Sequence, residues 1–212
     1  DVVAQEHHLR TDLELQLGVS GVARLAAAEV ANATPDGSKI AIQNASLFTI
    51  TPLAVAENEV TNLDSFDVVQ GVSRDDYVLV TNPASGYRTL DDIKRATRVV
   101  RYGTTGVGTG AQLSAALLFK TSNVNAQAVP FDGGAPALAA VLGNQVDVAS
   151  IQVGEAIENI QSGKLMPLAV FSPERIGFLP EVPTAKDRRG NPMVVKISGT
   201  VEPSMPVNCL AT

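Results

Sequence analysis

Residues 99–109 read Val-Val-Arg-Tyr-Gly-Thr-Thr-Gly-Val-Gly-Thr, a short apolar run that breaks into glycines and hydroxyls. The apolar spacing of residues 111–119 directly afterwards predicts a helix. A strand that enters a helix through such a turn leaves backbone N–H groups and the positive end of the helix dipole directed at one point. The hydroxyls of Thr104, Thr105 and Thr109 add donors without adding charge. The stretch therefore predicts a strand, a turn and a helix N-terminus that suit a bound carboxylate.

Two other classes of glycine-rich turn fit this stretch poorly. The spacing of Gly103, Gly106 and Gly108 does not match the dinucleotide-binding fingerprint, and no Lys follows the turn as a phosphate-binding P-loop requires. A structural alternative stays open, in which the turn is only a tight connection and its hydroxyls cap the helix.

The rest of the chain alternates between predicted strands and predicted helices. Helices are expected at residues 22–32, from Thr89 onward, at 111–119, from the second glycine turn through Val141, and at 155–162. Strands are expected at residues 39–42, 68–72, 77–80, 99–102, 126–130, 146–150 and 166–171. This alternation predicts an α/β fold, with a parallel or mixed sheet covered by helices.

Two local signals refine this interpretation. Thr89-Leu90-Asp91-Asp92 matches a capping box whose third helical residue is Asp instead of Glu. A second glycine turn, residues 131–136, follows the strand predicted at 126–130 and opens the next helix. Because both glycine turns follow strands, we expect them at one end of the sheet, facing one cleft.

Composition excludes several classes of protein. The 212 residues are 45% hydrophobic, which is enough for a buried core, and carry a net charge of −6, which argues against nucleic acid as a partner. One cysteine, Cys209, excludes an intrachain disulfide. No apolar stretch approaches the length of a transmembrane helix, so we expect no direct insertion into a membrane.

The titratable residues do not form a catalytic pattern. His7 and His8 are adjacent and are the two histidines of the chain, so they lack the spacing of a metal site on a helix. The acidic pairs Asp75-Asp76 and Asp91-Asp92 are expected in turns and caps. Asp147 follows an apolar strand position, where it could bond loop amides. We therefore expect no enzyme activity, no metal and no cofactor.

Several motifs occur together in an order that resembles a known family. The chain resembles the solute-binding proteins of tripartite tricarboxylate transporters, the Bug receptors, in residues 34–37, 102–109, 129–138, 141–147 and 162–170, then at Arg175 and in residues 179–184. Together these motifs cover about residues 19–184, most of the chain.

The resemblance implies a two-lobed α/β fold of the periplasmic-binding type II class, with a ligand cleft between the lobes. Residues 1–80 would form part of the first lobe and residues 81–185 the second lobe, which carries both glycine turns. Residues 186–212 would return toward the first lobe. Members of the family hold small carboxylates or aromatic acids through backbone amides, hydroxyls and water.

The resemblance also implies a set of ligand-binding residues. One carboxylate cradle would comprise Thr104, Thr105, Gly106, Gly108 and Thr109. A neighbouring wall would comprise Phe131, Asp132, Gly133 and Gly134. The loop that approaches from the first lobe would comprise Asn44, Ala45 and Ser46. For Asp147, the resemblance implies a structural role.

Features at both ends of the family pattern are missing from the sequence. Residues 1–16 contain neither the first strand nor the proline-glycine-glycine loop of the family, and residues 185–212 lack its tryptophan-containing strand. We interpret the chain as a shortened form of such a receptor, the alternative being a divergent receptor that has lost part of its site.

The expected function is a non-enzymatic receptor in the periplasm, or otherwise outside the cytoplasm. It would be a monomer that captures a small organic carboxylate and presents it to the membrane permease subunits of a tripartite tricarboxylate-type transporter. The alternative is a ligand-sensing domain of the same fold that acts in signalling or regulation, because fold alone does not separate transport from sensing.

Overall fold

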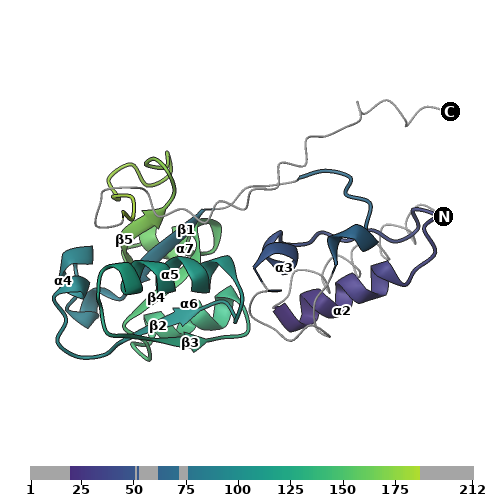
Figure 1. Cartoon of the computed structure of the whole chain (residues 1–212). Helices are drawn as coiled ribbons and strands as arrows, with labels where there is room; N and C mark the ends of the chain where they lie inside the picture. The colour runs from purple at the N-terminus through teal and green to yellow at the C-terminus, as the bar shows by residue number, and fades with distance from the viewer. Residues whose placement is uncertain (1–19, 51, 53–61, 72–75, 187–212) are drawn as a thin grey trace.

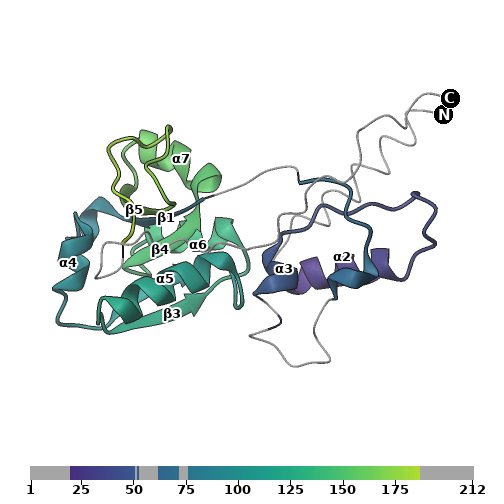
Figure 2. The same ribbon diagram turned by 45° about the horizontal axis from the view of Figure 1, so that its top comes forward.

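The computed structural model describes residues 20–50, 52, 62–71 and 76–186 (Figure 1). The predictions for His7, His8, Asp75 and Cys209 lie outside these residues. The chain from residue 76 to residue 186 forms an α/β unit around one sheet, and the helices nearest the N-terminus lie to one side of it in both ribbon views (Figures 1 and 2).

The sheet has five strands in the order β3-β2-β4-β1-β5. Strand β2 is parallel to β3 and β4, whereas β1 is antiparallel to β4 and β5, so the mixed sheet expected from the sequence is confirmed. The strands are β1 (Tyr77–Thr81), β2 (Val100–Thr104), β3 (Ala126–Pro130), β4 (Val148–Gln152) and β5 (Met166–Phe171).

The helices follow the predicted order within a few residues, except for the short helix Ser46–Thr49, which was not predicted. They are α2 (Ser20–Ala31), α3 (Ser46–Thr49), α4 (Leu90–Lys94), α5 (Gly110–Thr121), α6 (Gly134–Leu142) and α7 (Val153–Gln161), with two 3₁₀ turns at Leu63–Ser65 and Pro83–Ser85. The capping box is confirmed, because the Asp92 amide donates to Thr89 and the Thr89 amide donates to the Asp92 carboxylate. Hydrogen bonds to the Asp92 carboxylate from the Arg88 amide, from Thr89 and from the Arg95 side chain lower the pKa of Asp92 to about 2. Among the described residues, no helix has the length and apolarity to span a membrane.

The helices cover the two faces of the sheet separately (Figure 2). On one face, Leu118 and Phe119 of α5 and Ile93 of α4 pack in the same buried cluster as the sheet residue Tyr102. On the other face, α6 and α7 bury their apolar residues against the opposite sides of the same strands, as at Val141. Apolar residues on both faces are what a sheet needs when helices cover both of its sides.

Three strand predictions differ from the structure. No strand is assigned at residues 39–42 or 68–71, and the side chains of Ile40 and Ile42 are 56% and 41% exposed. Strand formation depends on packing against the rest of the fold as well as on the apolar pattern of the segment itself. Strand β4 begins at Val148, two residues after the predicted start at Val146, because the preceding turn extends to Asp147.

Polar groups at the amino ends of β2 and β4 hold these strands together. The guanidinium of Arg98 donates two hydrogen bonds to the carboxylate of Asp147, at 3.0 and 2.7 Å, and the amide of Arg101 donates a third at 2.8 Å. Burial raises the pKa of Asp147, but the hydrogen bonds from Arg98 and Arg101 outweigh it, so the pKa lies below its ordinary value. The expectation that Asp147 is structural agrees with these contacts.

Candidate functional site

The carboxyl ends of three parallel strands meet at one end of the sheet. In the order β3-β2-β4, β2 leads into α5 on one face, whereas β3 and β4 lead into α6 and α7 on the other face. Neighbouring strands whose connections leave toward opposite faces create a crevice at their carboxyl ends, where ligands bind in open α/β sheets. The first glycine turn (residues 104–110) and the second glycine turn (residues 131–134) both lie at this end.

Several polar groups of the first glycine turn bond within the turn. Thr109 is the N-cap of α5, and its hydroxyl donates to the Gly106 carbonyl at 2.8 Å and accepts from the Gln112 amide at 3.3 Å. The Gly108 amide donates to the Gln112 side chain at 2.8 Å. Gly106 has a φ of 134°, which favours glycine. The turn is therefore held in shape by its own caps.

Other donors of the same turn remain available. Within the part of the chain that the structure describes, the hydroxyl of Thr105 and the amides of Gly106 and Val107 have no hydrogen-bond partner. Thr105 is half-buried and Val107 is exposed. These donors come directly before the N-terminus of α5, whose dipole favours an anion, and the turn contains no acidic residue.

Buried hydroxyls lie beneath this turn. Thr104 and Ser150 are fully buried and Ser114 is 2% exposed, and none of the three hydroxyls has a partner among the described residues. Thr104 follows Gly103 and Ser150 follows Ala149, and Gly103 and Ala149 are register partners in β2 and β4. An unpaired buried hydroxyl is costly, so such groups indicate a place where a ligand or water can bind.

The start of α5 is packed against β1. A Cβ on Gly110 would lie only 2.7 Å from the ring and the hydroxyl of Tyr77. A side chain larger than hydrogen at this position would therefore displace the aromatic ring or the helix. Gly110 lets the N-terminus of α5 approach the sheet closely.

The second glycine turn is hydrogen-bonded to the first. The amide of Phe131 donates to the carbonyl of Thr104 at 2.9 Å, and the amide of Gly133 donates to the carbonyl of Phe131 at 3.0 Å. Gly133, the N-cap of α6, has a φ of 106° and supplies no side-chain cap. Asp132 is exposed. The structure thus joins the two turns that contain these predicted site residues, through Phe131 and Thr104.

A carboxylate lies against the N-terminus of α6. A Cβ on Gly134 would overlap the carboxylate group of Glu155, which belongs to the first turn of α7. Gly134, the first residue of α6, is buried. The second glycine turn therefore already has an acidic side chain at its helix end, unlike the first.

The third group of predicted site residues lies elsewhere. Asn44, Ala45 and Ser46 come at the start of α3, where the Asn44 side chain accepts from the Ser46 amide at 2.9 Å. Among the described residues, no hydrogen bond joins them to either glycine turn. Their role in binding stays a prediction.

Three residues near the site were not singled out from the sequence. Tyr77 and Glu155 reach the turns from elements distant in sequence, so no local pattern identifies them. Gln112 could have been found, because Thr109 and Gln112 have the Thr-x-x-Gln spacing of a capping box.

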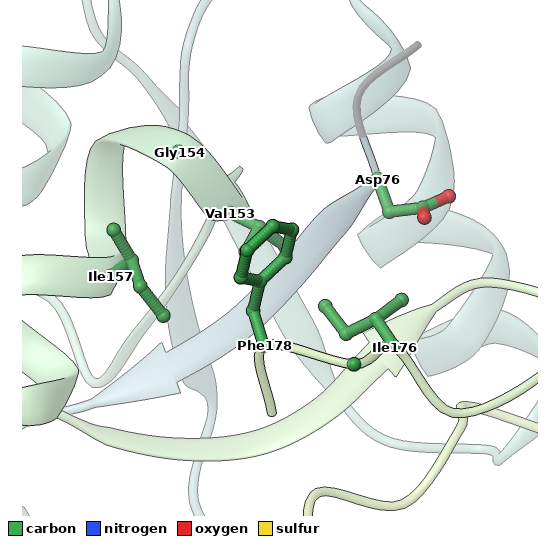
Figure 3. Close-up of a pocket in the computed structure, with 7 residues that line it drawn as sticks. Asp76, Val153, Gly154, Ile157, Ile176 and Phe178 are labelled. Atoms are coloured by element: carbon green, nitrogen blue, oxygen red, sulfur yellow. The ribbon is translucent and has the colours of Figure 1, made fainter. Parts of the chain in front are cut away.

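A separate pocket of 360 Å³ lies beside α7 and the loop after β5 (Figure 3). It is lined by Asp76, Val153, Gly154, Ile157, Ile176, Gly177 and Phe178. Phe178 extends over the pocket and is 80% exposed. The lining is apolar apart from one acidic residue, so the chemistry of this pocket does not suit a carboxylate.

Comparisons with known proteins agree with this geometry. A model of the tripartite tricarboxylate transporter family receptor matches residues 17–206, which extends beyond residue 184, where the resemblance in the sequence motifs ends. A UPF0065 protein of Bordetella pertussis is 28% identical over 159 residues, which are 73% of this chain and 49% of that protein. The chain spans between about a third and about half of the length of the curated relatives it matches.

Solved structures show the same fold. MatC from Rhodopseudomonas palustris, solved with bound malate, is 26% identical with a TM-score of 0.67, over 80% of this chain and 58% of that one. Rpa4515 of R. palustris, solved with adipate, has a TM-score of 0.71 at 22% identity, over 76% of this chain and 56% of that one. The fold is that of the periplasmic binding proteins, and the chain belongs to the tripartite tricarboxylate transporter receptor family.

Proposed function

We propose that this protein is a receptor that binds a small organic carboxylate at the first glycine turn and delivers it to a tripartite tricarboxylate-type transporter. The observation that carries the proposal is the set of open donors before α5: the Thr105 hydroxyl and the Gly106 and Val107 amides. Neutral donors at a helix N-terminus can replace the water shell of a carboxylate.

The buried hydroxyl of Thr104 is the second element of the proposed cradle. It lies at the end of β2, just before the open donors, and has no partner among the described residues. A carboxylate or a bridging water would satisfy it. Thr109 and Gly108 would contribute by fixing the turn, because their bonds to Gly106 and Gln112 hold its shape.

The family relationship supports the remainder of the proposal. MatC was solved with malate, and a similar acid would suit this turn. Capture would involve closure of the two lobes over the ligand, with Phe131, Asp132, Gly133 and Gly134 on the neighbouring wall and residues Asn44, Ala45 and Ser46 approaching from the first lobe. The receptor would act as a monomer in the periplasm, with no catalytic step, and would meet the permease subunits of the transporter.

Calorimetric titration of the full-length protein with malate, succinate and succinamate tests this function. We expect Thr105→Val to weaken the tightest of these acids by about tenfold or more, because hydrogen bonds to charged groups contribute about 1.5–3 kcal/mol. Thr97→Val is the matched control, since Thr97 is exposed and precedes the opposite end of β2. If no acid releases or takes up heat, or if both variants bind alike, the proposed cradle is wrong.

A further inference from the structure

The hydroxyl of Thr104 points into the layer between α5 and the sheet. The preceding residue, Gly103, faces the other layer, because a Cβ on it would meet Val146 and Ala149, which belong to the buried cluster beneath α6 and α7. Successive residues of a strand point to opposite faces of the sheet. Thr104, the last residue of β2, is therefore directed toward α5.

Ser150 of β4 points into the same layer. It follows Ala149, which belongs to the cluster beneath α6 and α7, and its register partner Leu79 packs in the cluster on the α5 face. Ser150 and Thr104 each come one residue after the register pair of Ala149 and Gly103. The two residues therefore lie next to each other at the carboxyl ends of β4 and β2.

A third hydroxyl in this layer belongs to α5. Gly110, Ser114 and Leu118 are spaced by four residues, which places them on one face of the helix. Gly110 lies against Tyr77 of β1, and Leu118 is buried in the cluster between α5 and the sheet. Ser114, between them, is 2% exposed and faces the sheet.

The three hydroxyls have no partner among the described residues, so they do not bond to one another directly. The residues beside Ser114 on the buried side of α5 are small, namely Ala111 and Ala115, whereas Phe119 packs on the ring of Tyr102 farther along the helix. An internal water commonly makes about three hydrogen bonds to buried polar groups that lack other partners. Three hydroxyls from three elements, in a polar and loosely filled part of the layer, match that requirement.

We propose that Ser114 and Ser150 are positioning residues, which hold one internal water between α5 and the sheet and thereby direct the hydroxyl of Thr104 toward a ligand. The water accepts hydrogen bonds from the two serines and donates one to the Thr104 oxygen, so the Thr104 O–H can donate to a carboxylate at the first glycine turn. This inference rests on the proposed function, because it takes Thr104 as part of the cradle.

A double-mutant cycle tests whether the serines act through Thr104. Calorimetry at pH 7 measures the dissociation constant of the tightest-binding of malate, succinate and succinamate on the full-length protein. Ser150→Ala and Ser114→Ala are each made in the unmodified protein and in Thr104→Val. Alanine is the best helix former, so Ser114→Ala keeps α5 intact if Ser150→Ala fails to fold.

We expect Ser150→Ala and Ser114→Ala each to weaken binding by about threefold or more in the unmodified protein. In Thr104→Val the same changes should alter the dissociation constant by less than about 1.5-fold, because residues of one hydrogen-bond network are not additive. A merely structural role would weaken binding to the same extent in both backgrounds.

Ser172→Ala is the matched control. Ser172 is also 2% exposed, but its hydroxyl donates to the Glu174 carbonyl, so it has a partner within the fold. This variant should leave the dissociation constant within about twofold in both backgrounds. Weakening by Ser172→Ala as large as that by Ser150→Ala would overturn the proposal, because any buried serine would then have the same effect.

The other results separate this inference from the proposed function. Unchanged affinity in both serine variants, or equal weakening with and without Thr104, overturns the positioning role and leaves the receptor function in place. A crystal structure of the full-length protein with the acid bound should show a water within hydrogen-bond distance of all three hydroxyls, and its absence also overturns the role. Absence of binding by all three acids to the unmodified protein overturns the proposed function and this inference together.

Discussion

The two ends of the parallel strands use different chemistry. At the amino ends of β2 and β4, charged groups are paired: Asp147 accepts from Arg98 and from the Arg101 amide, and its carbonyl accepts from the Thr81 hydroxyl at 2.7 Å. At the carboxyl ends, the donors are neutral, and the buried hydroxyls of Thr104 and Ser150 have no partner within the described residues. The amino ends hold the strands in place, and the neutral, unpaired donors at the carboxyl ends support the proposal that a ligand binds there.

The largest effect on stability is expected at the amino ends of β2 and β4, where the charged groups are paired. Asp147→Ala should lower the free energy of unfolding by about 2–3 kcal/mol, because it removes a buried partner of three hydrogen bonds. We place the value below that of a fully buried pair, since Arg98 is 55% exposed and regains water. Urea unfolding at pH 7 measures the change.

The control for this variant is a surface carboxylate in α4. Asp91→Ala removes a carboxylate that is 72% exposed and 3.7 Å from Lys94. Its effect should stay within about 0.5 kcal/mol. Similar losses from Asp91→Ala and Asp147→Ala would contradict the structural role assigned to the amino ends of the strands.

At the carboxyl ends of the parallel strands, the largest effect on stability is expected from a substitution of Gly110. Gly110→Ala should cost about 1–3 kcal/mol, because the added methyl group would meet the ring of Tyr77 at 2.7 Å. Gly154→Ala is the contrasting variant, since a Cβ there has open space within α7, and it should stabilise the protein by up to about 1 kcal/mol. Thermal unfolding of the two variants should therefore give shifts of opposite sign, and shifts of equal sign would argue against close packing at the start of α5.

The alternation of strands and helices could be predicted because its signals are local. The Thr89 capping box and the strand at Ala126–Pro130 were both predicted from a few consecutive residues, and both are present. The strand predicted at residues 39–42 is not present, because strand formation depends on the surrounding fold as well as on the apolar pattern of the segment itself.

The contacts at the candidate site were harder to predict. The glycine turns themselves are visible in the sequence, because glycine, threonine and helix periodicity occur together. The contact of Glu155 with Gly134 and the contact of Tyr77 with Gly110 depend on how α6, α7 and β1 pack, and no short pattern specifies them. Sequence thus located the turns but not the groups that distinguish one turn from the other.

Acid should reduce the stability that the Asp147 carboxylate contributes at the amino ends of β2 and β4. The pKa of Asp147 in the folded protein lies below its ordinary value, despite burial that raises it, because of the bonds from Arg98 and Arg101. A group with a depressed folded pKa contributes stability that is complete above its unfolded pKa of about 3.9 and is lost as the pH falls through the folded value. The stability gap between the unmodified protein and Asp147→Asn should therefore be widest at pH 5–7 and narrower near pH 3.

Urea midpoints at pH 7, 5 and 3 measure this gap. Asp92 also has a lowered pKa, about 2, so both proteins retain an acid dependence from the Thr89 capping box. That shared contribution cancels when the two proteins are compared at each pH. A gap that stays constant from pH 7 to pH 3 would mean that the charge of Asp147 contributes little to the fold.

The smallest effect on stability is expected from Thr104→Val. This variant is also the sharpest test of the proposed binding site at the carboxyl ends of the strands. Valine has nearly the shape of threonine and removes a buried hydroxyl that has no partner in the described part of the chain. The free energy of unfolding should stay the same or rise by up to about 1 kcal/mol, since no hydrogen bond within the fold is lost.

Binding should respond in the opposite direction. If the Thr104 hydroxyl is satisfied by the ligand, Thr104→Val should weaken binding of the tightest acid by about tenfold while the protein remains as stable as before. Thr109→Ala provides the contrast, because Thr109 caps α5 and its loss should cost about 1 kcal/mol of stability. A fall in stability without a change in affinity for Thr104→Val would make this residue part of the fold alone and would move the proposed cradle to Thr105 and the amides of Gly106 and Val107.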